Sequence, residues 1–199
     1  MDSLDGSAPF SDVSGTDGPF PGERTFTCRI VPGPSRRHTL HLTGSLHTGW
    51  AGRLAAGLAA RHVSVVRAAA RRTSTRWTAE IVFDVLDEDV QPSAIDFLAL
   101  MNDHVPATRD GGRLALTSRR VARTRRDVLV EVRGEDTVGF LGRILHLFAD
   151  LGLFPHEMRV DTRGLEVRDV FRLQSAVGEA PPEGIVEALR RRLDRLVRE

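Results

Sequence analysis

Hydrophobic and polar residues follow two different periods along this chain, one typical of strands and one typical of helices. In the first half, alternation with a period of two, the pattern of a half-buried strand, occurs in segments 26–30, 39–43, 63–70 and 76–85. Apolar residues at helical spacing occupy 50–58 and, after a Pro-Ser start signal, 94–101. The first half therefore predicts the order strand, strand, helix, strand, strand, helix.

The second half repeats this order. Strand-like segments lie at 114–116, 128–132, 154–161 and 166–173, and helical stripes lie at 140–151 and 182–196. A shift of 90 residues places Gly49 on Gly139 and Arg53 on Arg143, and it aligns the strand patterns on both sides. We therefore predict an α+β protein of two ββαββα units, 23–108 and 109–199. Each is a four-stranded antiparallel sheet with two helices on one face, and its leading strand lies at the sheet edge.

Composition narrows the class of protein. Residues 1–22 are rich in Gly, Ser and Pro and poor in apolar side chains, which predicts a disordered tail. The 28 basic residues are all Arg and nearly balance 27 acidic ones, so the net charge of +1 favours no nucleic-acid partner. Cys28 is the single cysteine, and no apolar run is long enough to span a membrane. We expect a cytoplasmic protein.

One stretch resembles a known family. The sequence GEDTVGFLGRILHLFADLGL (134–153), followed by DTRG (161–164) and VRDVF (167–171), is similar to ACT domains, in particular the C-terminal ACT repeats of the bacterial uridylyltransferase/uridylyl-removing enzyme. The resemblance implies two ferredoxin-like units that bind an amino acid or similar small effector. It also implies a homodimer and an enzyme partner, with neither catalytic activity nor a cofactor of its own.

The turn before the helix at 140–151 is the predicted ligand site. The family's Asp-x-x-Gly element matches Asp136 and Gly139. Glycine allows close approach to a ligand, and the free N–H groups of the first helical turn suit a carboxylate. Asp136 would accept from an ammonium group, while Phe140 and Leu141 would pack on the ligand. The alternative is that Asp136 or Thr137 only caps the helix.

The first unit departs from this pattern. Gly49 and Trp50 stand where the second unit has Gly139 and Phe140, but Leu46 stands where Asp136 does. We include Gly49 and Trp50 as candidate ligand contacts. Without the acid, the alternative of a scaffold or dimer contact is favoured here.

Other function classes have weaker support. The seven His show no metal-binding spacing, and no Ser or Cys nucleophile motif appears, so we predict no catalytic residue and no metal site. The arginines between 119 and 126 are interpreted as a solvated linker between the units. An RNA-binding fold would need exposed aromatic residues on its central strands, and Tyr is absent. A module that only contacts another protein, without a ligand, stays open.

Overall fold

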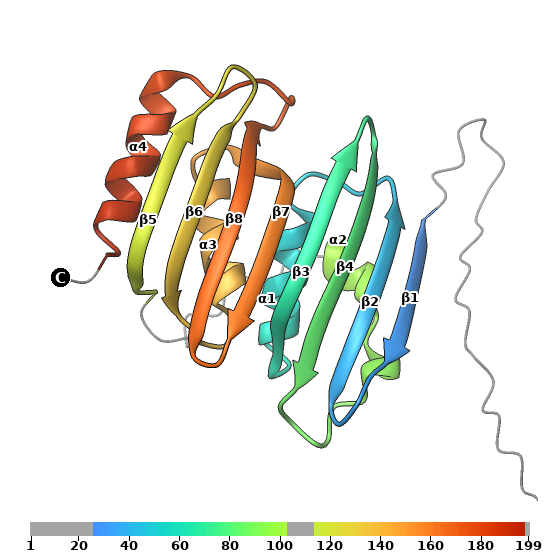
Figure 1. The fold of residues 1–199 in the computed structure, drawn as a ribbon. Coiled ribbons are helices and arrows are strands. Elements are labelled where there is room, and N and C mark those ends of the chain that lie inside the picture. Colours follow the sequence, from blue (N-terminus) through green and yellow to red (C-terminus); the bar gives the residue numbers. More distant parts are fainter. Residues whose placement is uncertain (1–25, 103–113, 198–199) are drawn as a thin grey trace, which may run out of the picture.

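The computed structural model describes residues 26–102 and 114–197, and these form one antiparallel sheet of eight strands with four α-helices (Figure 1). The first half contains β1 (Thr27–Pro32), β2 (Arg37–Gly44), α1 (Trp50–Ala59), β3 (Val63–Thr73), β4 (Arg76–Val85), a 3-10 turn (Pro92–Ala94) and α2 (Phe97–Asn102). The second half contains β5 (Leu116–Arg123), β6 (Val128–Glu135), α3 (Phe140–Ala149), β7 (Leu153–Arg163), β8 (Glu166–Ser175) and α4 (Glu183–Asp194).

The leading strand of each half lies at an outer edge of the sheet. The strand order is β1-β2-β4-β3-β7-β8-β6-β5, so β1 pairs only with β2, and β5 pairs with β6. This is the edge position that the sequence predicts for each leading strand. The backbone of Leu116 in β5 also binds the segment after α4, through a hydrogen bond to Leu196 O (2.8 Å).

The two halves share one sheet through β3 and β7, which the prediction of two four-stranded sheets did not include. The pairing runs from Arg67 opposite Asp161 to Arg71 opposite Glu157, with Ala69 opposite Arg159 at its centre. Ala69 and Arg159 are equivalent positions at the 90-residue offset. The halves are therefore related by a local twofold axis that passes through this pair.

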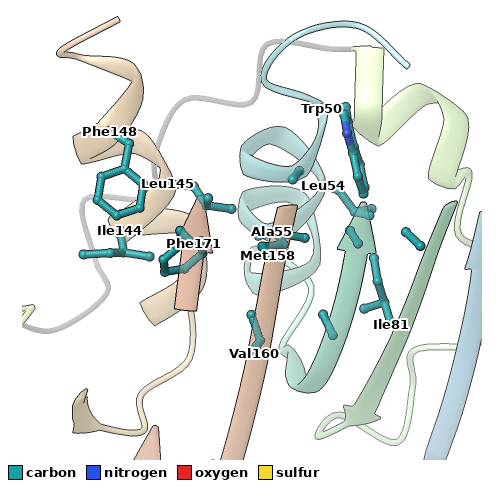
Figure 2. Close-up of a cluster of buried hydrophobic side chains, with 14 of the residues drawn as sticks. Trp50, Leu54, Ala55, Ile81, Ile144, Leu145, Phe148, Met158, Val160 and Phe171 are labelled. Atoms are coloured by element: carbon teal, nitrogen blue, oxygen red, sulfur yellow. The ribbon is translucent and has the colours of Figure 1, made fainter. Parts of the chain in front are cut away.

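Helices α1 and α3 pack against each other behind the junction of the two halves (Figure 1). A Cβ added to Gly142 would lie 3.2 Å from the backbone nitrogen of Ala56, so glycine permits this close crossing. Figure 2 shows side chains of both helices, including Leu54 and Phe148, in one cluster with the strand residues Met158 and Val160. The core is thus continuous across the two halves, and the relative placement of their helices is fixed by packing.

Two predictions about local structure were wrong. The arginines at 119, 120 and 123 belong to β5 rather than to a linker, because an edge strand keeps charged heads in solvent while their stems cover the sheet. Arg119 Nε donates to Asp194 Oδ1 of α4 at 2.6 Å. The second helix begins at Phe97 instead of 94, and Asp96 Oδ1 accepts from the Ala99 N–H at 2.9 Å. The predicted tail (1–22) and the predicted boundary between 108 and 109 lie outside the described residues.

Candidate functional site

The turns before α1 and α3 have the same backbone geometry. Gly49 has a φ of 82° and Gly139 a φ of 84°, in the left-handed region where only glycine is free of strain. Neither helix has a side-chain cap, so Asp136 and Thr137 do not play the capping role that was the alternative to a ligand site. Each turn therefore leaves helical N–H groups for another partner.

An arginine holds each turn from within its helix. Arg143 donates to Val138 O (3.2 Å) and to Thr137 Oγ1 (2.6 Å), and its equivalent, Arg53, donates to Thr48 O (3.2 Å) and Met101 O (2.6 Å). Thr137 therefore positions the turn by accepting from Arg143. The 90-residue repeat pairs the two arginines, but their contacts to the turn were not predicted.

The seven candidate residues line two cavities rather than one, both between the halves. Asp136, Thr137, Gly139, Phe140 and Leu141 line a cavity of about 20 Å³, hereafter the small cavity. Gly49 and Trp50 line a cavity of about 450 Å³, hereafter the large cavity. In each, the turn of one half faces the first residues of a central strand from the other half. These are Ser64 and Val65 of β3 in the small cavity, and Phe154 and Pro155 of β7 in the large one.

The small cavity is acidic and close to the size of one water molecule. Besides Asp136, it is lined by Asp169 of β8, whose side chain is fully buried and whose two carboxylate oxygens have no partner in hydrogen-bonding geometry. The pKa of Asp169 is raised to about 8, mainly by burial and also by the neighbouring Asp136 and Asp161, against an opposing backbone interaction at Asp161. Burial also raises the pKa of Asp136. At neutral pH, Asp169 therefore carries a proton.

Asp169 was missed at the sequence level, although a signal for it exists. Val167 and Phe171 alternate on the buried face of their strand, and Asp169 lies between them with the same parity. An acid at an inward position of an otherwise apolar strand is the mark of a buried titratable group. Its equivalent in the first half is Ala79, which is buried without any titratable group.

The large cavity is apolar and basic. The residues that line it are, in chain order, Leu46, Thr48, Gly49, Trp50, Ala51, Gly52, Arg53, Ala56, Arg72, Trp77, Gly142, Leu145, His146, Ala149, Phe154, Pro155, Ser175 and Ala176. Trp50 and Trp77 meet edge to face, with ring centroids 5.3 Å apart. Trp50 is 1% exposed, yet its Nε1–H has no hydrogen-bond partner. A volume of this size lies within the range of about 300–1,000 Å³ that is typical of small-molecule sites.

A second buried carboxylate, Asp127, belongs to a structural network away from both cavities. It accepts from Thr124 Oγ1 (2.7 Å), Arg172 (3.2 Å) and the His156 ring (3.2 Å). Although burial opposes ionisation, these hydrogen bonds lower the pKa of Asp127. The network closes the turn between β5 and β6. Among the described residues, no group of three or more His, Cys, Asp or Glu side chains is arranged to hold a metal ion.

Comparisons with known proteins add little to this geometry. No protein-family model matches the chain, and no curated protein matches it. A solved structure of an aspartate kinase from Synechocystis is similar, with a TM-score of 0.47 and 14% sequence identity over 80% of this chain. The match spans 27% of the kinase chain. Within the part of the chain that the structure describes, no helix is long and apolar enough to cross a membrane.

Proposed function

We propose that this protein is a non-catalytic regulatory protein with two ACT-type units, and that it binds a small effector in the large cavity. The supporting observation is the cavity itself, with about 450 Å³ of space enclosed by the Gly49 turn, α3 and the start of β7. An effector there contacts both halves at once. Its binding is therefore coupled to how the halves pack against each other, which is the general requirement for a regulatory signal.

The larger cavity shifts the expected site from the second unit to the first. An amino acid placed at Asp136 would have to fit a space of about 20 Å³, whereas the equivalent space at Gly49 is more than twentyfold larger. Equivalent positions of the two halves carry different side chains, and these differences make the small cavity acidic and the large cavity apolar and basic. We keep Asp136, Thr137, Gly139, Phe140 and Leu141 as a second proposed site, one that requires the small cavity to widen.

The α1 N-terminus provides the polar end of the proposed site. The N–H groups of Ala51 and Gly52 have no hydrogen-bond partner among the described residues, and α1 is ten residues long. The aligned peptide dipoles add partial positive charge at this end. A carboxylate of the effector would accept from these groups, while Trp50 and Trp77 pack against its apolar part.

Intrinsic fluorescence gives a direct test, because the two tryptophans of the chain, Trp50 and Trp77, both line the large cavity. We expect saturable quenching by at least one member of a panel of amino acids and small carboxylic acids. A ligand at a hundred times its Kd should also stabilise the fold by about 2.7 kcal/mol. Ala149→Phe, which fills the cavity from α3, should abolish both effects. A panel without any response would favour a module that only contacts another protein.

The proposal extends to assembly. We expect a homodimer, and an enzyme whose activity the effector-bound form alters. The outer strand β1 has one free edge for such contacts among the described residues, whereas the segment after α4 binds β5 at Leu116. Sedimentation equilibrium tests the homodimer, with and without the effector that fluorescence identifies. A single monomeric species in both conditions would contradict the expected homodimer.

A further inference from the structure

The two cavities are equivalent by position but opposite in charge. At the 90-residue offset, Asp136 of the small cavity corresponds to Leu46 of the large one, and the buried Asp169 corresponds to Ala79. In the reverse direction, Arg72 of the large cavity corresponds to Thr162 of the small one. The acidic side chains are therefore on one side of the local twofold axis, and this added guanidinium is on the other.

No acidic side chain lines the large cavity, among the residues that the structure describes. Two guanidinium groups do, and the partners of both are neutral. Arg72 donates to Gln174 Oε1 (3.2 Å), and Arg53 donates to the backbone oxygens of Thr48 and Met101. No carboxylate among the described residues forms an ion pair with Arg72 or Arg53. The cavity thus carries positive charge that a bound anion would neutralise.

The donors that line the cavity set the polar part of the ligand. Trp50 also carries an Nε1–H with no acceptor among the described residues, but this nitrogen is fully buried and does not face the open space. Free helix N–H groups and the guanidiniums are all donors, so the polar part of the ligand should consist of acceptors.

We infer that the large cavity binds an apolar carboxylic acid that has no ammonium group, such as a simple or 2-oxo acid with a branched or aromatic side chain, in preference to the corresponding amino acid. This inference rests on the proposed function. A carboxylate, with or without an adjacent carbonyl oxygen, supplies acceptors only. An ammonium group would bring up to three N–H donors and a positive charge next to Arg72, where no acid among the described residues is available to accept from it.

The apolar walls fit the remaining part of such a ligand. Trp50, Trp77, Leu145 and Phe154 come from both halves and form much of the apolar lining. Among the described residues, the lining has no polar side chain beyond those of Thr48, Arg53, Arg72, His146, Ser175 and the two indoles. A branched or aromatic side chain would therefore displace water from mostly apolar surface.

Matched ligand pairs test the inference, because each pair shares a side chain and differs at the α-carbon. Isothermal titration calorimetry of the full chain would compare 4-methyl-2-oxopentanoate and 4-methylpentanoate with leucine, and phenylpyruvate and 3-phenylpropanoate with phenylalanine. We expect at least one acid to bind about tenfold or more tightly than its amino acid, since the ammonium group is left without a partner. Equal or tighter binding of the amino acids would overturn the inference and leave the proposed function standing. Absence of binding by all six would overturn both.

Two variants test which residues of the large cavity cause the preference for the acid over the amino acid. Leu46→Asp installs the acid that the second half has at Asp136, and it should narrow or reverse the preference for the acid over the amino acid. Arg72→Gln should weaken binding of the acids by about tenfold, whereas Arg71→Gln, on the opposite face of β3, should leave it unchanged. Circular dichroism confirms that each variant is folded. An unchanged preference in folded Leu46→Asp together with unchanged acid affinity in Arg72→Gln would place the ligand elsewhere and contradict the inference.

Discussion

Asn in place of Asp169 is the substitution whose effect on stability follows most directly from the structure. The carboxyl group of Asp169 is fully buried on β8, its oxygens have no described partner in good hydrogen-bonding geometry, and its pKa is raised to about 8, mainly by burial. In the unfolded chain, the same group has a pKa of about 3.9. The folded protein therefore holds a proton between these two pH values that the unfolded chain has released.

The sign of the pH dependence follows from this difference. Below about pH 4, both states are protonated and the group has no effect on stability. Between about pH 4 and pH 8, the folded state binds one more proton, so the free energy of unfolding falls by about 1.4 kcal/mol per pH unit. Above pH 8, the loss reaches its full size of about 6 kcal/mol, which is a large part of the total stability of a typical domain.

Asp169→Asn removes the titration and keeps the shape of the side chain. We expect its free energy of unfolding, relative to the natural protein, to rise steadily from pH 5 to pH 8 and then level off. Urea denaturation followed by circular dichroism at unit pH intervals from 5 to 9 measures this difference. Asp89→Asn is the control, because Asp89 is exposed and is not among the groups that perturb Asp169, so this variant keeps the titration of Asp169 and should give a flat difference. A flat difference for Asp169→Asn as well would refute the assignment of a buried proton.

Three further substitutions or reactions test the packing. Gly139→Ala should lower the free energy of unfolding by about 1–2 kcal/mol, because the φ of 84° at this position is strained for any residue with a side chain. Gly184→Ala in α4 is the control, since a Cβ there has open space and should not be destabilising. Equal effects of the two substitutions in urea denaturation would contradict this. Phe148→Ala should lose about 3–5 kcal/mol, since Phe148 is fully buried and its ring lies 5.2 Å from that of Phe171; a loss under about 1 kcal/mol would indicate a looser core. The pKa of the Cys28 thiol is raised to about 11, mainly by burial and also by Asp96. At pH 8, iodoacetamide should therefore react about a hundredfold more slowly with the folded chain than with the chain in urea, and comparable rates would show that the thiol is not shielded.

The helices and strands could be predicted from the sequence, because the spacing of apolar side chains reflects which face of each element is buried. The period of α3 and the parity of β8 predicted both elements, and the glycine at each turn indicated where the chain needs a positive φ. Pairing between β3 and β7 was not predictable in this way. It is made of backbone hydrogen bonds between strands about 90 residues apart, and backbone groups are the same in every sequence.

The candidate site shows the same division between local and distant information. The turns at Gly49 and Gly139 were predicted from spacing, and they line cavities. The volumes of these cavities were not predictable, because each depends on side chains from the other half, such as Phe154 opposite Gly49. Comparison of equivalent positions would have located the buried acid at Asp169 and the unmatched charge at Arg72.

The junction of β3 and β7 also affects how the protein can respond to ligand concentration. In a dimer of identical single units, each substitution appears at both equivalent sites, and two like sites can show cooperativity. Here both sites are encoded in one polypeptide, so Leu46 and Asp136 are free to differ. A chain with one large site should bind its ligand with a stoichiometry of one per chain, and any cooperativity then has to arise between chains of the dimer rather than within one chain.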